Sequence, residues 1–170
     1  MNTNKPNIVR DKETDDLRAA IEHRATWFYL MLKAAKERGL DASFAREAIF
    51  NCGCFHGENK FPRTSDIKTF ADAFANENAV KIFEMDVKTT DETLDIDFHY
   101  CPLVEAWEKL GAGDEEISEL CDIAMEGDRG IVSKYGDFEF KLGKTIAQGN
   151  KVCEIRIYKN CRHVNSEVVR

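Results

Sequence analysis

The sequence has no apolar run long enough to cross a lipid bilayer and no block of consecutive basic residues. A membrane-spanning helix needs roughly 20 consecutive, mostly apolar residues. Proteins that bind nucleic acid usually carry clustered lysine and arginine. Here the net charge is −7, and the most basic segment, 33–38, alternates with Ala and Glu as a solvated helix face does. We therefore expect neither a membrane nor nucleic acid as a partner.

The first residues also lack the features of an export signal. Segment 1–13 is polar, with no apolar core of a signal peptide. The six cysteines are then expected in the reducing cytoplasm, as structural, catalytic or metal-binding thiols rather than disulfides. A length of 170 residues with 43% apolar residues suits one compact domain. We expect a loose arm over 1–13, one domain over 14–160 and a tail over 161–170.

The spacing of apolar residues divides the chain into helices and strands. Spacings of three and four predict a helix over 14–38, a second helix from residue 41 that ends near the glycines of NCGCFHG, and a third helix that ends at residue 74. Alternation of polar and apolar residues predicts strands further on. The remaining predicted elements are strands over 81–87 and 93–101, helices over 102–110 and 114–135, and strands over 138–143 and 152–159.

These elements together predict an α+β fold. Three N-terminal helices precede a β-hairpin, two further helices and a second β-hairpin. We expect the hairpins to form one four-stranded antiparallel sheet packed by helices. The chain shows no internal repeat or low-complexity block.

A carboxylate interrupts the apolar face of the helix predicted over 114–135. Asp128 lies two turns after Cys121 on nearly the same face, and a glycine stands on each side of it. A buried carboxylate must be paired, protonated or placed at a cavity, because burying it alone costs several kcal/mol. Asp128 therefore either lines a polar pocket or pairs with Arg24, with Arg129 or with a helix end. The glycines would allow a ligand or another backbone to come close.

Several other side chains are candidates for a site. His99 and Cys101 share the polar face of a predicted strand, two residues apart, where they could be a reactive pair or structural residues. Asp122 and Glu126 form a second line on the helix that carries Asp128. Arg24 points either to solvent or inward to a carboxylate.

The segment CGCFH suggests a metal site at first sight, through Cys52, Cys54 and His56. Its spacing is not that of the common zinc modules, and no second CxxC completes a tetrahedral site. We expect no metal or other cofactor, and keep a zinc ion held by cysteine and carboxylate as an alternative.

Two long blocks, HYCPLVEAWEKLGAGDEEISELCDIAMEGDRGI and FEFKLGKTIAQGNKVCEIRIYK, resemble the L-2-amino-thiazoline-4-carboxylic acid hydrolase family. EHRATWFYLMLKAAKERGLD and FAREAIFNCGCFHG are also similar to members of that family, so the resemblance spans about 21–159. It implies a cytoplasmic hydrolase that opens a cyclic amidine, the aminothiazoline ring, to a carbamoyl-cysteine. It also implies a place in a bacterial route of cysteine metabolism.

This chemistry requires a carboxylate for the amidinium, a group that moves protons, and a cation for the substrate carboxylate. It also requires an activated water or a thiolate to attack the ring. The candidates are Asp128 or Glu126 for the amidinium, His99 or Asp122 for proton transfer, Arg24 or Arg129 for the carboxylate, and Cys101 or Cys121 as nucleophile.

Two other interpretations remain open at this point. Helices around an antiparallel sheet, with scattered cysteines and acidic residues, would also suit a non-enzymatic small-molecule- or metal-binding sensor domain. A zinc ion held by cysteines would favour the sensor, and ring opening by metal-free protein would favour the enzyme. An inactive family member is the third possibility, which the intact motifs oppose. The sequence does not set the oligomeric state.

Overall fold

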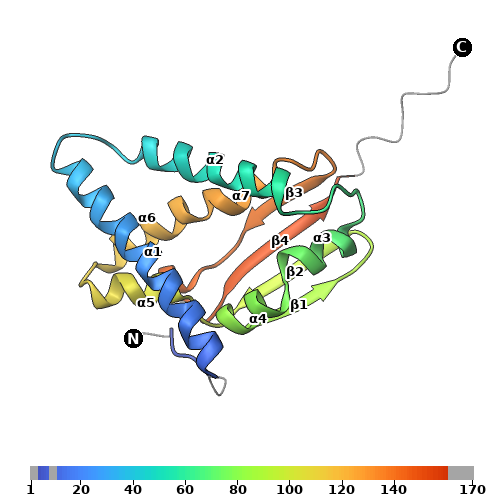
Figure 1. The fold of residues 1–170 in the computed structure, drawn as a ribbon, viewed down its shortest axis with the longest axis horizontal. Coiled ribbons are helices and arrows are strands. Elements are labelled where there is room, and N and C mark those ends of the chain that lie inside the picture. The colour runs from blue at the N-terminus through green and yellow to red at the C-terminus, as the bar shows by residue number, and fades with distance from the viewer. Residues whose placement is uncertain (1–3, 8–10, 161–170) are drawn as a thin grey trace, which may run out of the picture.

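The computed structural model of this chain describes residues 4–7 and 11–160. Within these residues the chain forms a four-stranded antiparallel sheet in the order β1-β2-β4-β3, with helices on one face (Figure 1). The α+β fold class and the single antiparallel sheet are confirmed. The helices are α1 (Lys12–Lys36), α2 (Ser43–Asn59), α3 (Ile67–Phe74), α4 (Glu77–Phe83), α5 (Pro102–Lys109), α6 (Asp114–Ala124) and α7 (Glu126–Val132). The strands are β1 (Met85–Thr89), β2 (Thr93–Phe98), β3 (Phe138–Leu142) and β4 (Cys153–Lys159), with a 3₁₀ helix, η1 (Ile146–Gln148), before β4.

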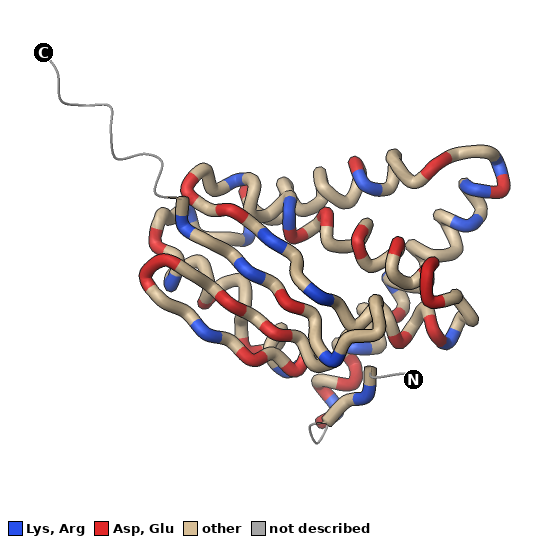
Figure 2. The backbone as a smooth tube through the Cα atoms, turned by 180° about the vertical axis from the view of Figure 1, so that it is seen from behind, with Lys and Arg blue, Asp and Glu red and all other residues tan. Residues whose placement is uncertain are grey.

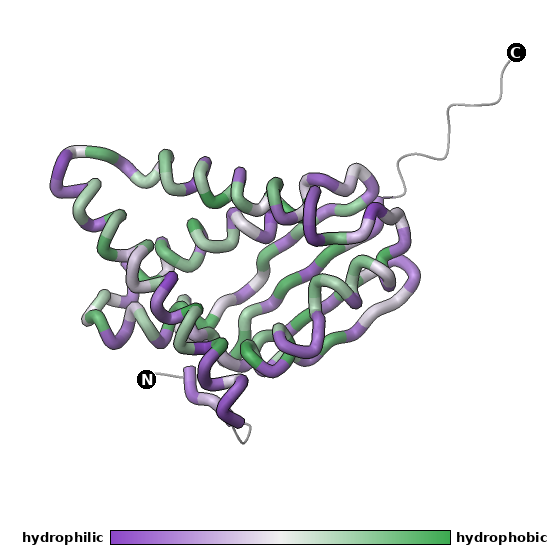
Figure 3. Tube along the Cα trace, in the orientation of Figure 1, coloured by the Kyte–Doolittle hydropathy of each residue, from purple (hydrophilic) through white to green (hydrophobic). Residues whose placement is uncertain are grey.

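The sheet has one apolar face and one charged face, as the alternation in the sequence predicts. Ile96 of β2 pairs with Ile155 of β4, and both side chains are fully buried under the helices. On the other face, Arg156 donates a hydrogen bond to Asp97 at 2.7 Å. Figure 2 shows acidic and basic residues along this uncovered face, and Figure 3 shows the alternation of hydropathy along the strands.

The strand predicted over 81–87 is wrong in its first half, which is helical. Asn76 caps α4 by accepting a hydrogen bond from the backbone N–H of Ala79 at 3.1 Å. The helix ends where Glu84 adopts the left-handed conformation, with φ at 51°. Arg18 holds this turn, because its guanidinium donates to the Glu84 carboxylate at 3.1 Å inside the protein. Strand β1 therefore begins only after Glu84.

The long helix predicted over 114–135 is divided in two. Helix α6 ends at Ala124, helix α7 begins at Glu126, and Met125 lies between them. The chain leaves the helix at Val132 rather than at residue 135. Asp128 is consequently a residue of the short helix α7.

The glycines of CGCFHG do not end the second helix, which continues to Asn59. Gly53 and Gly57 lie in its middle, on the side that packs against α7. A Cβ atom at Gly57 would lie 2.9 Å from the carbonyl oxygen of Ile131, so the two helix backbones are in direct contact. Helices α1 and α2 diverge from the loop that joins them, and α1 packs on α5 while α2 packs on α7 (Figure 1).

Part of the arm expected to be loose is anchored. The Asn4 side chain is buried, donates to the backbone carbonyl of Cys101 at 3.0 Å and accepts from its N–H at 2.8 Å. Residues 1–3 and 8–10 of that arm, and the whole predicted tail over 161–170, lie outside the described residues. No helix in the described part of the chain combines the length and apolar character needed to span a membrane.

Candidate functional site

A cavity of about 590 Å³ lies between the helices and the apolar face of the sheet. Helices α1, α2, α6 and α7 contribute to its wall, and so do α4 and the strands. This volume falls in the range of about 300–1,000 Å³ that is usual for small-molecule sites. The lining is mainly apolar, and a few polar side chains stand out in it. Three of them, Arg24, His56 and Asp128, come from three different helices.

Asp128 presents its carboxyl group to this cavity. Among the described residues this carboxyl makes no hydrogen bond or ion pair, and burial raises its pKa from 3.8 to about 6. The positive charges of Arg24 and Arg129 act in the opposite direction, so they lie close enough to influence Asp128 without pairing with it. The interruption of the apolar helix face thus corresponds to an unpaired acid at a cavity.

His56 also lines the cavity, from α2. Its Nδ1 atom is buried and has no hydrogen-bond partner in the described part of the chain. Burial lowers the pKa of the imidazole, and the charges of Lys60 and Arg24 lower it further. The lowered pKa favours the neutral ring at pH 7, and the partnerless Nδ1 atom is enclosed by the protein. The sequence interpretation considered His56 only as a metal ligand.

The third polar group is Arg24 of α1, which is largely exposed and lines the same cavity. No hydrogen bond or ion pair engages its guanidinium among the residues described. Arg24 is therefore exposed to solvent, as in the first of the two orientations considered from the sequence, and also lines the cavity. Its charge acts on the pKa values of Asp128, His56 and Cys101, so these groups share one electrostatic environment.

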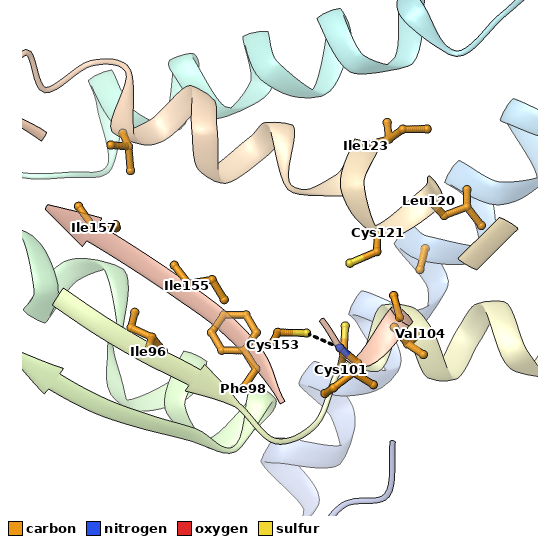
Figure 4. Close-up of a cluster of buried hydrophobic side chains, with 14 of the residues drawn as sticks. Ile96, Phe98, Cys101, Val104, Leu120, Cys121, Ile123, Cys153, Ile155 and Ile157 are labelled. Atoms are coloured by element: carbon orange, nitrogen blue, oxygen red, sulfur yellow. Dashed lines mark hydrogen bonds between the residues drawn. The ribbon is translucent and has the colours of Figure 1, made fainter. Parts of the chain in front are cut away.

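Three thiols of the cavity lining lie near one another (Figure 4). Cys101, Cys121 and Cys153 are buried, line the cavity, and have pKa values raised mainly by burial, that of Cys153 to about 12. The Cys153 sulfur accepts a hydrogen bond from the backbone N–H of Ile146 at 3.2 Å. A thiol with a raised pKa is a poor nucleophile near neutral pH. The structure thus places Cys101 and Cys121 in the lining of the same cavity as Asp128, in surroundings that favour the protonated thiols.

A fourth cysteine of the cavity has different surroundings. Cys52 is exposed to solvent and lies one helical turn before His56, so both residues line the cavity from the same side of α2. The sequence interpretation missed this relationship because it ended the helix at the glycines. The i,i+4 spacing would have shown it if the helix had been extended to residue 59.

Three candidate residues lie in an ion-pair cluster rather than in the cavity lining. Arg46 of α2 donates to Asp122 at 2.7 Å and to Glu126 at 3.3 Å. Arg129 donates to Asp122 at 2.7 Å and to Glu126 at 2.9 Å. These four side chains satisfy one another and connect α2 to α6 and α7. Asp122, Glu126 and Arg129 were considered as substrate contacts. In the structure they lie outside the cavity lining and pair with one another and with Arg46.

His99 is also remote from the cavity lining. It follows β2, and its Nε2 atom lies 2.8 Å from Oδ2 of Asp86 at an exposed position. The strand alternation correctly placed His99 on the polar face, but that face is turned to solvent. His99 and Cys101, considered from the sequence as a reactive pair or as structural residues, thus have different surroundings: His99 lies beside exposed Asp86, and Cys101 is buried.

Metal ligands do not gather in the structure. In residues 4–7 and 11–160, no group of three or more His, Cys, Asp and Glu side chains is arranged to hold a metal ion. Cys54, the third member of the CGCFH trio, lies 3.6 Å from the hydroxyl of Ser133.

Comparison with known proteins gives a family and a fold. No curated protein sequence matches the chain. Among solved structures, the chain is similar to a trafficking protein particle complex subunit 3 from Naegleria fowleri covalently bound to palmitic acid. The TM-score is 0.57 at 14% identity, over 90% of this chain and 99% of that chain, which shows a shared fold. The profile of the L-2-amino-thiazoline-4-carboxylic acid hydrolases matches residues 18–157, most of the chain. The protein therefore belongs to the L-2-amino-thiazoline-4-carboxylic acid hydrolase family.

Proposed function

We propose that this protein hydrolyses a cyclic amidine, L-2-amino-thiazoline-4-carboxylic acid or a close heterocycle, to a carbamoyl-cysteine-type product. Membership of the family supports a hydrolase. The observation that carries the proposal is the unpaired carboxyl of Asp128 in a mainly apolar cavity. An amidinium ion is the natural partner of such a carboxylate, because two N–H groups can donate to its two oxygens.

Binding and ionisation of Asp128 support each other. With a pKa of about 6 the carboxyl is largely ionised at pH 7, and a bound cation would favour the ionised form further. The apolar surroundings strengthen the attraction between the two charges relative to water. The positive charge on the amidinium also makes the ring carbon between sulfur and nitrogen more electrophilic.

His56 is suited to transfer protons in this reaction. Its imidazole, whose pKa is lowered by burial, can accept a proton from a water molecule as the water oxygen attacks the ring carbon. The bond between that carbon and the ring sulfur then breaks, and the imidazolium returns the proton to the leaving sulfur. The hydroxyl group of the intermediate loses its remaining proton to solvent as the carbonyl forms. The former ring carbon becomes the carbonyl carbon of the carbamoyl group, and the sulfur becomes a thiol.

Arg24 is suited to hold the carboxylate of the substrate. Its guanidinium lies at the cavity, is accessible from solvent, and makes no ion pair among the described residues. An arginine can bind a carboxylate through two parallel hydrogen bonds. Asp128 and Arg24 would together fix both ends of the heterocycle relative to His56.

The direct test is turnover by the purified protein. We expect formation of the carbamoyl-cysteine, followed by mass spectrometry and by release of a titratable thiol, beyond the rate without protein. We expect Asp128→Asn to lower kcat/KM at least 100-fold. Asp86→Asn, which changes an exposed carboxylate on the far face of the sheet, should leave it unchanged.

Two outcomes would contradict the proposal. Full activity of Asp128→Asn would remove Asp128 from the reaction. Absence of turnover across a small panel of cyclic amidines, both with chelator and with added divalent metal, would contradict the proposed hydrolysis itself.

A further inference from the structure

One part of the cavity wall contains only apolar side chains. Helices α3 and α4 and strands β1 and β2 contribute Phe74, Ala79, Phe83, Met85 and Phe98, and no polar side chain. The polar lining residues Arg24, His56 and Asp128 all come from other elements. Such a wall offers nothing to the amidine or to the carboxylate of a small polar heterocycle.

Two aromatic side chains of the apolar wall pack against each other. The rings of Phe83 and Phe98 stack on each other at a centroid distance of 4.8 Å, which holds both side chains against α4 and β2. Protein interiors normally contain few voids larger than a water molecule. This cavity, at about 590 Å³, is about four times the ~150 Å³ of an apolar cavity that binds benzene. A single amidine ring would leave most of it unfilled.

Apolar side chains also surround the solvent-exposed part of the cavity. Trp27 and Met31 of α1 and Phe44 of α2 line it although 63%, 64% and 42% of their surfaces are exposed. Large apolar side chains grouped at an exposed position usually mark a surface that contacts a ligand or a partner. Here they add exposed apolar surface to the cavity lining.

From the size of the cavity, its apolar wall and the exposed apolar side chains in its lining, we propose that the cyclic amidine opened by this protein carries a large apolar substituent, of the size of an alkyl chain of about eight carbons or more. The charged group lies at Asp128, and the substituent lies against the wall formed by Phe83, Met85 and Phe98. This inference rests on the proposed function for the identity of the charged group. It rests on the apolar wall alone for the substituent.

Calorimetric titration of the whole protein with straight-chain amidines tests the substituent. Butanamidine, hexanamidine, octanamidine and decanamidine, each below its micelle concentration, should bind with Kd values that fall about fourfold per added methylene group. The alkanoic acids of the same lengths form a parallel series. The inference would be overturned if the Kd values were independent of chain length in both series.

The two series separate this inference from the proposed function. A chain-length dependence in the amidines supports both. A dependence in the alkanoates, with no binding of any amidine, supports the apolar substituent and overturns the amidine as the recognised group.

A matched pair of variants tests the location of the substituent. Ala79→Phe adds a ring to the apolar wall, and it should weaken decanamidine binding at least tenfold while butanamidine binding stays unchanged. Ala20→Phe makes the same change at an exposed position of α1 outside the cavity lining, and it should change neither. Unchanged decanamidine binding by Ala79→Phe would place the chain elsewhere. The wild-type series decides the inference if Ala79→Phe does not fold.

Discussion

Gly130 of α7 lies directly against the backbone carbonyl of Phe50 in α2, and no side chain fits between the two helices there. Gly53 of α2 is in equally close contact with the carbonyl of Gly127. Gly130 and Gly53 therefore allow a close contact between two helix backbones. This contact sets the position of α7, and with it the position of the Asp128 carboxyl in the cavity.

The first prediction concerns this helix contact. Gly130→Ala should destabilise the protein by about 2–3 kcal/mol, because its Cβ would overlap the Phe50 carbonyl and force the helices apart. Gly127→Ala is the matched control. Its Cβ would meet Ile49 at an ordinary 3.7 Å, so it should be neutral or stabilising by up to about 1 kcal/mol. Urea denaturation of both variants measures the difference, and equal stabilities would contradict the proposed contact.

The second prediction follows from the raised pKa of Asp128. A folded-state value of about 6 against 3.8 means that the folded protein binds this proton more tightly than the unfolded chain. The group therefore favours the folded state fully below about pH 4, and this contribution is lost as the pH rises through about 6. Asp128→Asn removes the titration. The stability of the variant relative to wild type should thus rise between pH 4 and pH 7.5.

The size of this change has an upper bound. A shift of about two pKa units corresponds to about 3 kcal/mol, and contact with solvent in the cavity reduces it. Urea denaturation of both proteins at the two pH values gives the double difference, in which the other titrating groups cancel. A difference between variant and wild type that is the same at both pH values would contradict the unpaired state of Asp128.

Local patterns were sufficient for most of the fold. Alternation predicted β4 and most of β2, because one face of the sheet is covered by helices and the other is solvated. The strand expected over 93–101 ends at Phe98, and Cys101 is buried instead of lying on the polar face. Alternation failed at 81–87, where the helix stops at Glu84 through an ion pair with Arg18, 66 residues away. The sequence on either side of Glu84 contains no sign of that partner.

A residue of the candidate site could be predicted where its side chain interrupts the apolar pattern of its own helix. Asp128 was found because a charge interrupts an apolar helix face. His56 was missed because α2 had to continue through Gly53 and Gly57, and this depends on their contact with α7. For Asp122 and Glu126 the decisive partner is Arg46, 76 and 80 residues earlier. Pairing over such separations is a property of the tertiary structure.

The third prediction is that the ion-pair cluster is structural. Asp122→Asn and Glu126→Gln should keep turnover within about twofold of wild type, because their partners are Arg46 and Arg129. Arg46→Ala should lower stability by about 0.5–1 kcal/mol, since the pairs are partly exposed. Steady-state kinetics and urea denaturation of the three variants provide the measurements. A 100-fold loss of kcat in Asp122→Asn or Glu126→Gln at unchanged stability would show that the carboxylate takes part in the reaction.

The fourth prediction concerns His99. Its imidazole contacts Asp86 on the exposed side of the sheet, so His99→Gln should leave kcat and KM unchanged. His56→Gln is the comparison. It keeps a hydrogen-bonding side chain in the cavity and loses the basic nitrogen, so it should lower kcat at least 100-fold. Equal effects of the two substitutions on kcat would argue against proton transfer by His56.

The last prediction concerns the thiols of the cavity. Burial raises the pKa values of Cys101, Cys121 and Cys153, so iodoacetamide at pH 8 should leave them unmodified in the folded protein. Cys52 is exposed and should be alkylated within minutes. Peptide mass spectrometry locates each modified residue. Alkylation in guanidinium chloride, where all four should react, is the control. Rapid modification of Cys101 or Cys121 in the folded state would show a reactive thiol beside Asp128, and would favour a covalent mechanism over attack by water.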